Sequence, residues 1–185
     1  MATTKLMTIE AFEQLADDGY RYELVDGELA RMPPTGEGHG DVDRQFIWLL
    51  EGFIRPRGVE KLFVETAFVL SPDRQTVRQP DIAFVHAHRL RHDRDRERAV
   101  RLAPDLVIEI VSPTDRRSAV VAKAHEYLSY GVKLVWVVDP ASRSITVFQS
   151  NGSEDVLGQN DTIDGEDVLP GFRATLRDIF QLRDR

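Results

Sequence analysis

Two acidic residues and a lysine lie in or beside stretches of sequence that are otherwise apolar. Glu109 interrupts the run at residues 106–111, and Asp81 directly follows Pro80 at the head of the run at residues 82–85. An unpaired carboxylate inside a protein costs several kcal/mol, or its pKa rises until the group is neutral. Glu109 therefore requires a compensating partner, which could be a cation, a lysine or a metal ion.

The run around Glu109 has the composition of a buried strand. Its β-branched residues and its length favour a strand over a helix, and apolar residues on both faces are typical of a central strand. Side chains alternate along a strand, so Glu109 shares a face with Val107 and Val111 and points toward a covered surface. Asp81 lies at a strand mouth, because proline suits the first residue of a strand. Taken alone, the motif Pro80-Asp81 favours a simple turn that opens the strand.

A helix is predicted directly after the Glu109 strand. Ser112 is the expected N-cap, with Pro113 in the first turn and Asp115 near the positive end of the helix dipole. Lys123 lies on the flank of the apolar stripe of this helix. It could be a solvated lysine whose stem covers apolar surface, or it could reach back to the carboxylates on the neighbouring strands. The stripe consists of Val120, Ala124, Tyr127, Leu128 and Gly131.

Several motifs in a fixed order carry a resemblance to a known family. They are the stretch at residues 22–29, Pro80-Asp81, Glu-Ile-Val-Ser-Pro at residues 109–113, Lys123 with Tyr127 and Gly131-Val132, the stretch at residues 136–140, and Val-Leu-Pro-Gly-Phe at residues 168–172. Together they resemble the Uma2 family of restriction-endonuclease-like proteins in the PD-(D/E)XK nuclease superfamily, over nearly the whole chain. One departure from the superfamily pattern is Val111, which stands where its lysine would be. Lys123 on the following helix is the matching position in this family.

The resemblance implies an α/β fold in the broad sense, that is, a mixed α+β arrangement. We expect one restriction-endonuclease-like domain over residues 1–185, with a central mixed β-sheet flanked by helices. An N-terminal hairpin and a C-terminal hairpin plus helix are expected around this core.

The resemblance also implies a metal-dependent endonuclease that hydrolyses phosphodiester bonds of DNA. Asp81, Glu109 and Lys123 would form the catalytic group, with Glu23 as a further carboxylate. Asp81, Glu109 and the backbone carbonyl of Ile110 would bind Mg²⁺, an ion that prefers hard oxygen ligands, with Mn²⁺ as a substitute. For Glu23 an outward-facing strand position is the alternative.

Two other functions stay open on the sequence alone. The chain could be a catalytically inactive binding or structural module with a nuclease fold, which its net charge of −7 favours slightly. It could also be a metal-dependent phosphohydrolase of small substrates. A homodimer would suit a double-strand cutter, but that expectation is an analogy.

Composition excludes some classes of protein. The 185 residues contain no cysteine, which excludes a disulfide framework and cysteine-based metal or nucleophile chemistry. Because there is no signal-peptide pattern and no apolar run long enough to span a bilayer, we expect a cytoplasmic protein without a membrane partner. The 42% apolar and 30% charged residues are ordinary for a globular domain.

The remaining elements follow from periodicity and turn signals. His39 falls in a predicted loop and is left outside the expected site. The arginine-rich segment at residues 86–101 is expected to be a solvated loop or short exposed helix, with phosphate contact as the sharper alternative. Helices are predicted at 8–15, 42–54 and 174–182, and strands at 59–70 and 133–139. One hairpin is predicted at 20–32, turning at Asp26-Gly27, and a second from strands 144–149 and 155–158. Loops are predicted at 32–40, 71–78 and 86–101, and a polar, turn-rich stretch at 161–170.

Overall fold

A six-stranded mixed sheet forms the centre of the computed structural model, which describes residues 6–33, 36–58 and 60–181. Its strand order is β10-β9-β8-β7-β6-β3. Strands β7 and β8 are parallel, and each of the other neighbouring pairs is antiparallel, which confirms the predicted mixed sheet. The strands are β3 (Glu60–Val64), β6 (Ile82–His86), β7 (Leu106–Ile110), β8 (Leu134–Asp139), β9 (Ser144–Gln149) and β10 (Glu154–Leu157).

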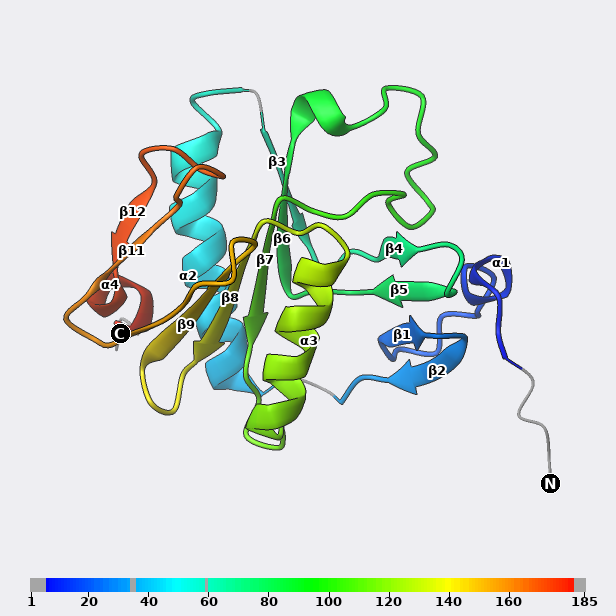
Figure 1. The fold of residues 1–185 in the computed structure, drawn as a ribbon, viewed down its shortest axis with the longest axis horizontal. Coiled ribbons are helices and arrows are strands. Elements are labelled where there is room, and N and C mark those ends of the chain that lie inside the picture. Colours follow the sequence, from blue (N-terminus) through cyan, green and yellow to red (C-terminus); the bar gives the residue numbers. More distant parts are fainter. Residues whose placement is uncertain (1–5, 34–35, 59, 182–185) are drawn as a thin grey trace.

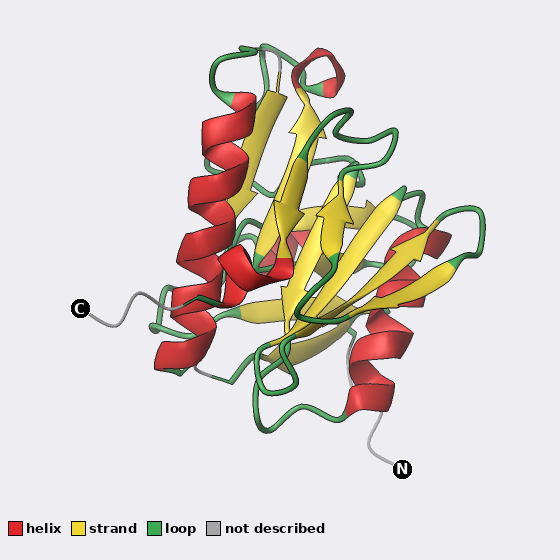
Figure 2. Ribbon diagram, turned by 90° about the vertical axis from the view of Figure 1, so that its left-hand side faces the viewer, coloured by secondary structure: helices red, strands yellow, loops and turns green. Residues whose placement is uncertain are grey.

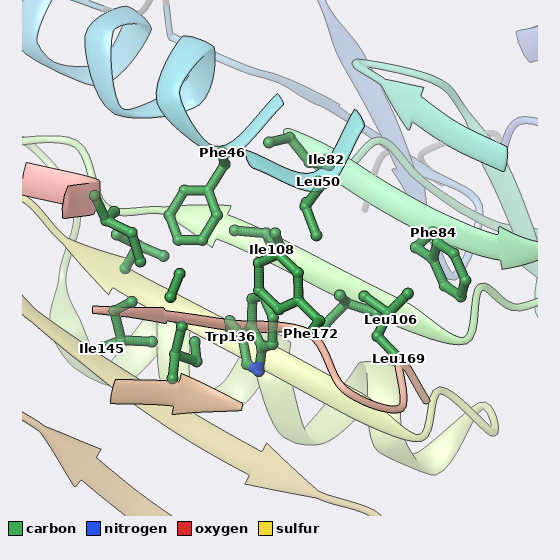
Figure 3. Packing of buried hydrophobic residues seen from close by; sticks show 14 of the residues in the cluster. Phe46, Leu50, Ile82, Phe84, Leu106, Ile108, Trp136, Ile145, Leu169 and Phe172 are labelled. Atoms are coloured by element: carbon green, nitrogen blue, oxygen red, sulfur yellow. The ribbon is translucent and has the colours of Figure 1, made fainter. Parts of the chain in front are cut away.

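Helices cover both faces of this sheet (Figures 1 and 2). Helix α2 (Glu37–Ile54) and the short α4 (Leu176–Phe180) pack on one face, and α3 (Arg117–Ser129) packs on the other. In Figure 3, Phe46 and Leu50 of α2 point toward Ile108 and Trp136 of the sheet. Burial of this apolar surface is the main force that holds the layers together.

The predicted alternation of side chains along β7 is confirmed. Leu106, Ile108 and Ile110 belong to the core under α2, whereas Val107 packs with Tyr127 on the α3 side. Glu109 therefore points toward α3, because it shares its face of the strand with Val107.

A second sheet lies beside the first and carries the N-terminal hairpin (Figure 1). Its order is β2-β1-β5-β4, and the short helix α1 (Ile9–Phe12), capped by the Thr8 side chain, packs against it. The predicted turn at Asp26-Gly27 joins its first two strands. The strands are β1 (Tyr22–Val25), β2 (Glu28–Arg31), β4 (Phe68–Ser71) and β5 (Thr76–Arg78).

The prediction of one strand over residues 59–70 is wrong. The segment forms β3 in the large sheet and β4 in the small sheet, and Glu65 between them has a left-handed backbone with φ of 45°. The loop expected at 71–78 contains β5, which pairs with both β4 and β1. Val59 lies outside the described residues. The change of sheet depends on distant pairing partners, which local periodicity does not record.

Two helix starts also differ from the predictions. Helix α2 begins at Glu37 rather than at residue 42, so His39 is helical and not in a loop. Pro34 and Thr35 of that predicted loop lie outside the described residues. Helix α3 begins at Arg117, and Ser112 is not its cap. Instead the backbone N–H of Ser112 donates to Asp115 Oδ2 at 2.8 Å, which closes a turn ahead of the helix.

The C-terminal hairpin of β9 and β10 is confirmed, but a small sheet was missed. Strands β11 (Thr162–Asp164) and β12 (Arg173–Thr175) pair with each other, and only the residues after Thr175 enter α4. The predicted helix end at Leu182 lies outside the described residues. Within the described ranges, no helix has the length and apolar character needed to cross a membrane.

Candidate active site

Asp81 and Glu109 face each other on neighbouring antiparallel strands. Strand β6 pairs with β7 so that Ile82 lies opposite Ile108, and extending this register by one residue brings Asp81 opposite Glu109. Asp81 Oδ2 accepts a 2.8 Å hydrogen bond from the backbone N–H of Ile110, which fixes the carboxylate at the strand mouth. The two acids are therefore positioned by the sheet itself.

Lys123 on α3 contacts two carboxylates, one from β7 and one from β1. Its Nζ lies 3.0 Å from Glu109 Oε2 and 3.0 Å from Glu23 Oε1. Tyr127, one helical turn further along, donates its hydroxyl to Glu109 Oε1 at 2.7 Å. The lysine thus reaches back to the carboxylates, and the alternative of a solvated surface lysine is wrong.

Glu23 is buried, with 2% of its surface exposed, so the outward-facing alternative is also wrong. Pairing of Leu24 with Val77 brings Glu23 opposite Arg78, whose Nη1 lies 2.6 Å from Glu23 Oε2. The backbone N–H of Gln79 donates to Glu23 Oε1 at 3.0 Å. Arg78 also pairs with Glu126 of α3. These contacts bring the second sheet onto the same cluster.

His39 belongs to this neighbourhood, although the sequence analysis left it out. It is 7% exposed, and its Nε2 lies 3.3 Å from Asp81 Oδ1. Burial lowers the pKa of His39, but the adjacent Asp81 carboxylate outweighs that effect and raises the pKa above its ordinary value. Arg21 Nη1 lies 3.4 Å from the same Asp81 oxygen and 3.0 Å from Glu65 Oε1.

A sequence signal for His39 existed in the helical spacing. His39, Val42, Phe46 and Leu50 share the buried face of α2 at the intervals expected of one helical stripe. Extending the stripe by one turn toward the N-terminus would have brought His39 into the interior. The glycines around His39 favoured the prediction of a loop for this turn of the helix.

Comparison with known proteins bears on what this cluster is for. A family model described as "Uma2: Putative restriction endonuclease" matches residues 9–177. The chain belongs to the Uma2 family. A protein from Anabaena variabilis ATCC 29413, described as a "putative nuclease belonging to DUF820", has a similar fold, with a TM-score of 0.81 at 18% identity over 94% of this chain and 97% of that chain. No curated protein matches the chain.

Burial and charge set the protonation of the acids in this Uma2 protein. Burial raises the pKa of Glu109; Lys123 opposes the rise and Asp81 adds to it, and the resulting value is about 7. Burial also raises the pKa of Glu23, but Lys123 and Arg78 more than compensate, and its pKa lies below the usual range. Glu109 is therefore the acid of the cluster whose charge is least compensated.

The residues fit a small divalent cation that prefers oxygen ligands. Asp81 and Glu109 lie opposite each other in the register of neighbouring strands. A cation bound to both would offset the cost of burying Glu109 and the repulsion from Asp81, which both raise the pKa of Glu109. Within the described ranges, no three His, Cys, Asp or Glu side chains are grouped as a metal site. Side chains would thus supply two ligands, and backbone carbonyls and water the others, as Mg²⁺ prefers. The carbonyl of Ile110 as a third ligand stays a prediction.

The arginine-rich segment of this Uma2 protein mostly contacts its own chain. Arg89 pairs with the buried Asp105 at 2.8 Å, and Arg101 pairs with Glu13 at 2.8 Å. Arg91 and Arg98 also form ion pairs with carboxylates. These contacts favour the interpretation of an exposed loop tied to the protein surface over that of a phosphate grip.

Proposed function

We propose that this protein is a metal-dependent endonuclease that hydrolyses phosphodiester bonds of DNA, with Mg²⁺ as its ion and Mn²⁺ as a substitute. The observation that carries the proposal is the 3.0 Å contact of Lys123 with Glu109, on a strand whose register brings Glu109 opposite Asp81. Membership of a family described as "Putative restriction endonuclease" supports the same reaction class.

Each residue has a role in this proposal. Asp81 and Glu109 would hold the cation, which polarises the phosphate and lowers the pKa of water when bound. Lys123 would orient the attacking water or stabilise the negative charge that develops on the phosphate. Glu23 and Tyr127 would hold the Lys123 ammonium and the Glu109 carboxylate in place through their hydrogen bonds.

A plasmid-cleavage assay with Mg²⁺ tests the proposal. We expect Asp81→Ala and Glu109→Ala each to abolish cleavage, because each removes a ligand of the cation. Glu154→Ala removes a carboxylate from the exposed surface of β10 and should cleave like the unchanged protein. Undiminished cleavage by both site variants would refute the assignment.

The second candidate is a binding module that keeps the fold and cuts nothing. Its support is the ion pairing of the cluster, in which Lys123 and Arg78 already compensate the charge of Glu23, together with the net charge of −7. Calorimetry with Mg²⁺ or Mn²⁺, followed by the plasmid assay, separates the two functions. Metal binding without cleavage under both ions would favour the binding module.

A further inference from the structure

A cleft of about 590 Å³ adjoins the acidic cluster and has no role in the chemistry described above. His39 lines the cleft, and the Nε2 atom of the same ring lies 3.3 Å from Asp81. Val111 and Ser112, which directly follow the Glu109 strand, form another part of the wall. His39 therefore belongs both to the wall of the cleft and to the immediate surroundings of Asp81.

The position of the cleft in the fold is one where ligands bind. It opens at the carboxyl ends of β7 and β8, the parallel pair that α3 connects, and Asp139 at the end of β8 lines it. Ligands of open sheets with parallel strands bind in the crevice outside these ends. The volume also lies within the range of about 300–1,000 Å³ that is typical of small-molecule sites.

Two long helices start at the cleft without a side-chain cap. Gly36 before α2 and Arg116 before α3 make no capping hydrogen bond, and Gly36, Gly38 and Arg117 line the cleft. The first N–H groups of a helix have no partner within the helix, and the helix dipole adds partial positive charge there. Both starts therefore favour an anion such as a phosphate group.

The Nδ1 atom of His39 gives an independent indication that the cleft binds a ligand. The side chain of His39 is 6% exposed, and its Nδ1 has no hydrogen-bond partner among the described residues, whereas its Nε2 lies 3.3 Å from Asp81 Oδ1. A buried polar group without a partner is costly, and such groups are rare in native proteins. A ligand in the cleft with hydrogen-bonding groups would bring partners to this wall.

The charges around the cleft suit one phosphate better than many. Arg117 and Arg143 are exposed at the cleft and form no ion pair within the part of the chain that the structure describes. The carboxylates of Asp115 and Asp139 accept hydrogen bonds from their own turns. The two positive and two negative side chains give no net formal charge, so the electrostatic potential at the cleft does not favour several consecutive phosphate groups.

Most of the remaining wall is apolar. Val120 and Val121 from α3, Val42 from α2, Val137 from β8 and Phe180 from α4 face the cleft. A surface of this kind binds the flat face of a nucleobase better than it binds a solvated sugar–phosphate chain.

We propose that this cleft binds one unpaired nucleotide of the DNA strand next to the cleaved bond, with the base against the valines and the phosphate at the helix starts. The proposal rests on the proposed nuclease function and names its substrate class, which is DNA that is single-stranded or locally unpaired at the site. A base inside a duplex is stacked and paired, so it enters such a cleft only after leaving the helix.

A steric test uses two glycines of α2. A side chain added at Gly38 or at Gly52 meets open space, but Gly38 lines the cleft and Gly52 lies about 21 Å further along the helix axis. Both Gly38→Leu and Gly52→Leu should raise the melting temperature, because leucine favours helix more than glycine does. We expect Gly38→Leu alone to weaken binding of a short single-stranded DNA about tenfold or more, because it fills the site.

A charge test uses two exposed arginines. Arg143→Gln removes a cation at the cleft, and Arg55→Gln removes one at the opposite end of α2. Binding of the single strand should weaken about fivefold to tenfold in Arg143→Gln and stay unchanged in Arg55→Gln. Binding is followed by the fluorescence of a 2-aminopurine in the strand, in EDTA so that no cleavage occurs.

The comparison of DNA forms decides the substrate class. We expect the single strand to bind more tightly than the same strand in a duplex, and free deoxyadenosine monophosphate to compete only weakly. Equal binding by Gly38→Leu and Gly52→Leu would overturn the proposal, as would competition by the free nucleotide as strong as that of the strand. Because these measurements need no metal, they are independent of whether Mg²⁺-dependent cleavage is found.

Discussion

The ammonium of Lys123 and the carboxylate of Glu109 meet at 3.0 Å, one from a helix and the other from the central strand. The superfamily pattern would place the lysine two residues after the acid, where this chain has Val111. On that position the side chain would still lie on the α3 face of β7. In this protein the ammonium group comes instead from α3, which packs against that face of β7.

Replacement of Lys123 by alanine should separate its catalytic role from metal binding. We expect Lys123→Ala to slow Mg²⁺-dependent cleavage about 100-fold, because an electrostatic group at the phosphate is lost. Metal affinity in calorimetry should persist, since Asp81 and Glu109 remain. Lys61→Ala, which removes the same charge from β3, is the control. Loss of metal binding in Lys123→Ala would mean that the lysine acts structurally.

Arg78 should matter far more for stability than an exposed arginine nearby. Arg78→Ala leaves the buried Glu23 without its 2.6 Å partner, and breaking a buried pair costs about 3–5 kcal/mol. Arg74→Ala breaks an equally short pair with Asp26 at the surface and should cost far less, because solvent screens exposed ion pairs. Urea unfolding measures both. A similar loss in the two variants would show that Arg78 is not needed to compensate Glu23.

Asp43 should make the protein less stable as the pH rises. Burial and the charge of Asp81 raise the pKa of Asp43 from 3.8 to about 6, so between these values the folded state binds more protons than the unfolded state. The free energy of unfolding therefore falls across that window. Because Asp43 is only partly buried, solvent screening reduces the effect to about 1 kcal/mol.

Asp43→Asn provides the measurement for this prediction. In urea unfolding in EDTA at pH 4 to 8, the free energy of unfolding of the variant should rise relative to that of the unchanged protein as the pH rises toward about 7. Glu154→Gln on the exposed β10 strand should follow the unchanged protein throughout. A constant difference between Asp43→Asn and the unchanged protein at every pH would contradict the raised pKa.

Tyr127 should tune the pH profile of cleavage. Its hydroxyl donates to the Glu109 carboxylate at 2.7 Å and so stabilises the charged form. In Tyr127→Phe the pKa of Glu109 should rise further, and the acid limb of the cleavage profile should move up by about one pH unit. Tyr130→Phe, near the end of the same helix, should leave the limb in place. An unmoved limb in Tyr127→Phe would show that Glu109 does not govern it.

Parts of the fold could be predicted because they depend on neighbouring residues alone. The alternation around Glu109 predicted that this side chain shares a covered face with Val107, which the structure shows to be the α3 face, and the Asp26-Gly27 turn was predicted to join the first hairpin, as it does. The first helix was predicted to start at residue 8, and Thr8 is its cap. Each of these features follows from the geometry of a few consecutive residues.

The wrong predictions about strand pairing and about Glu23 depend on distant partners. Residues 59–70 read as one strand, because nothing local shows that β3 pairs with β6 while β4 pairs with β5. Glu23 could have faced water or the interior, and the pairing of β1 with β5 decided between them by bringing Arg78 alongside.

The sequence alone determined which residues could do chemistry: two acids in strand positions and a lysine at the edge of a helical stripe. Only the tertiary structure decided that these groups meet, that Glu23 is buried with them, and that His39 lies beside Asp81. The physical reason is that side-chain direction follows from local backbone geometry, whereas proximity depends on how strands far apart in the chain pair and pack.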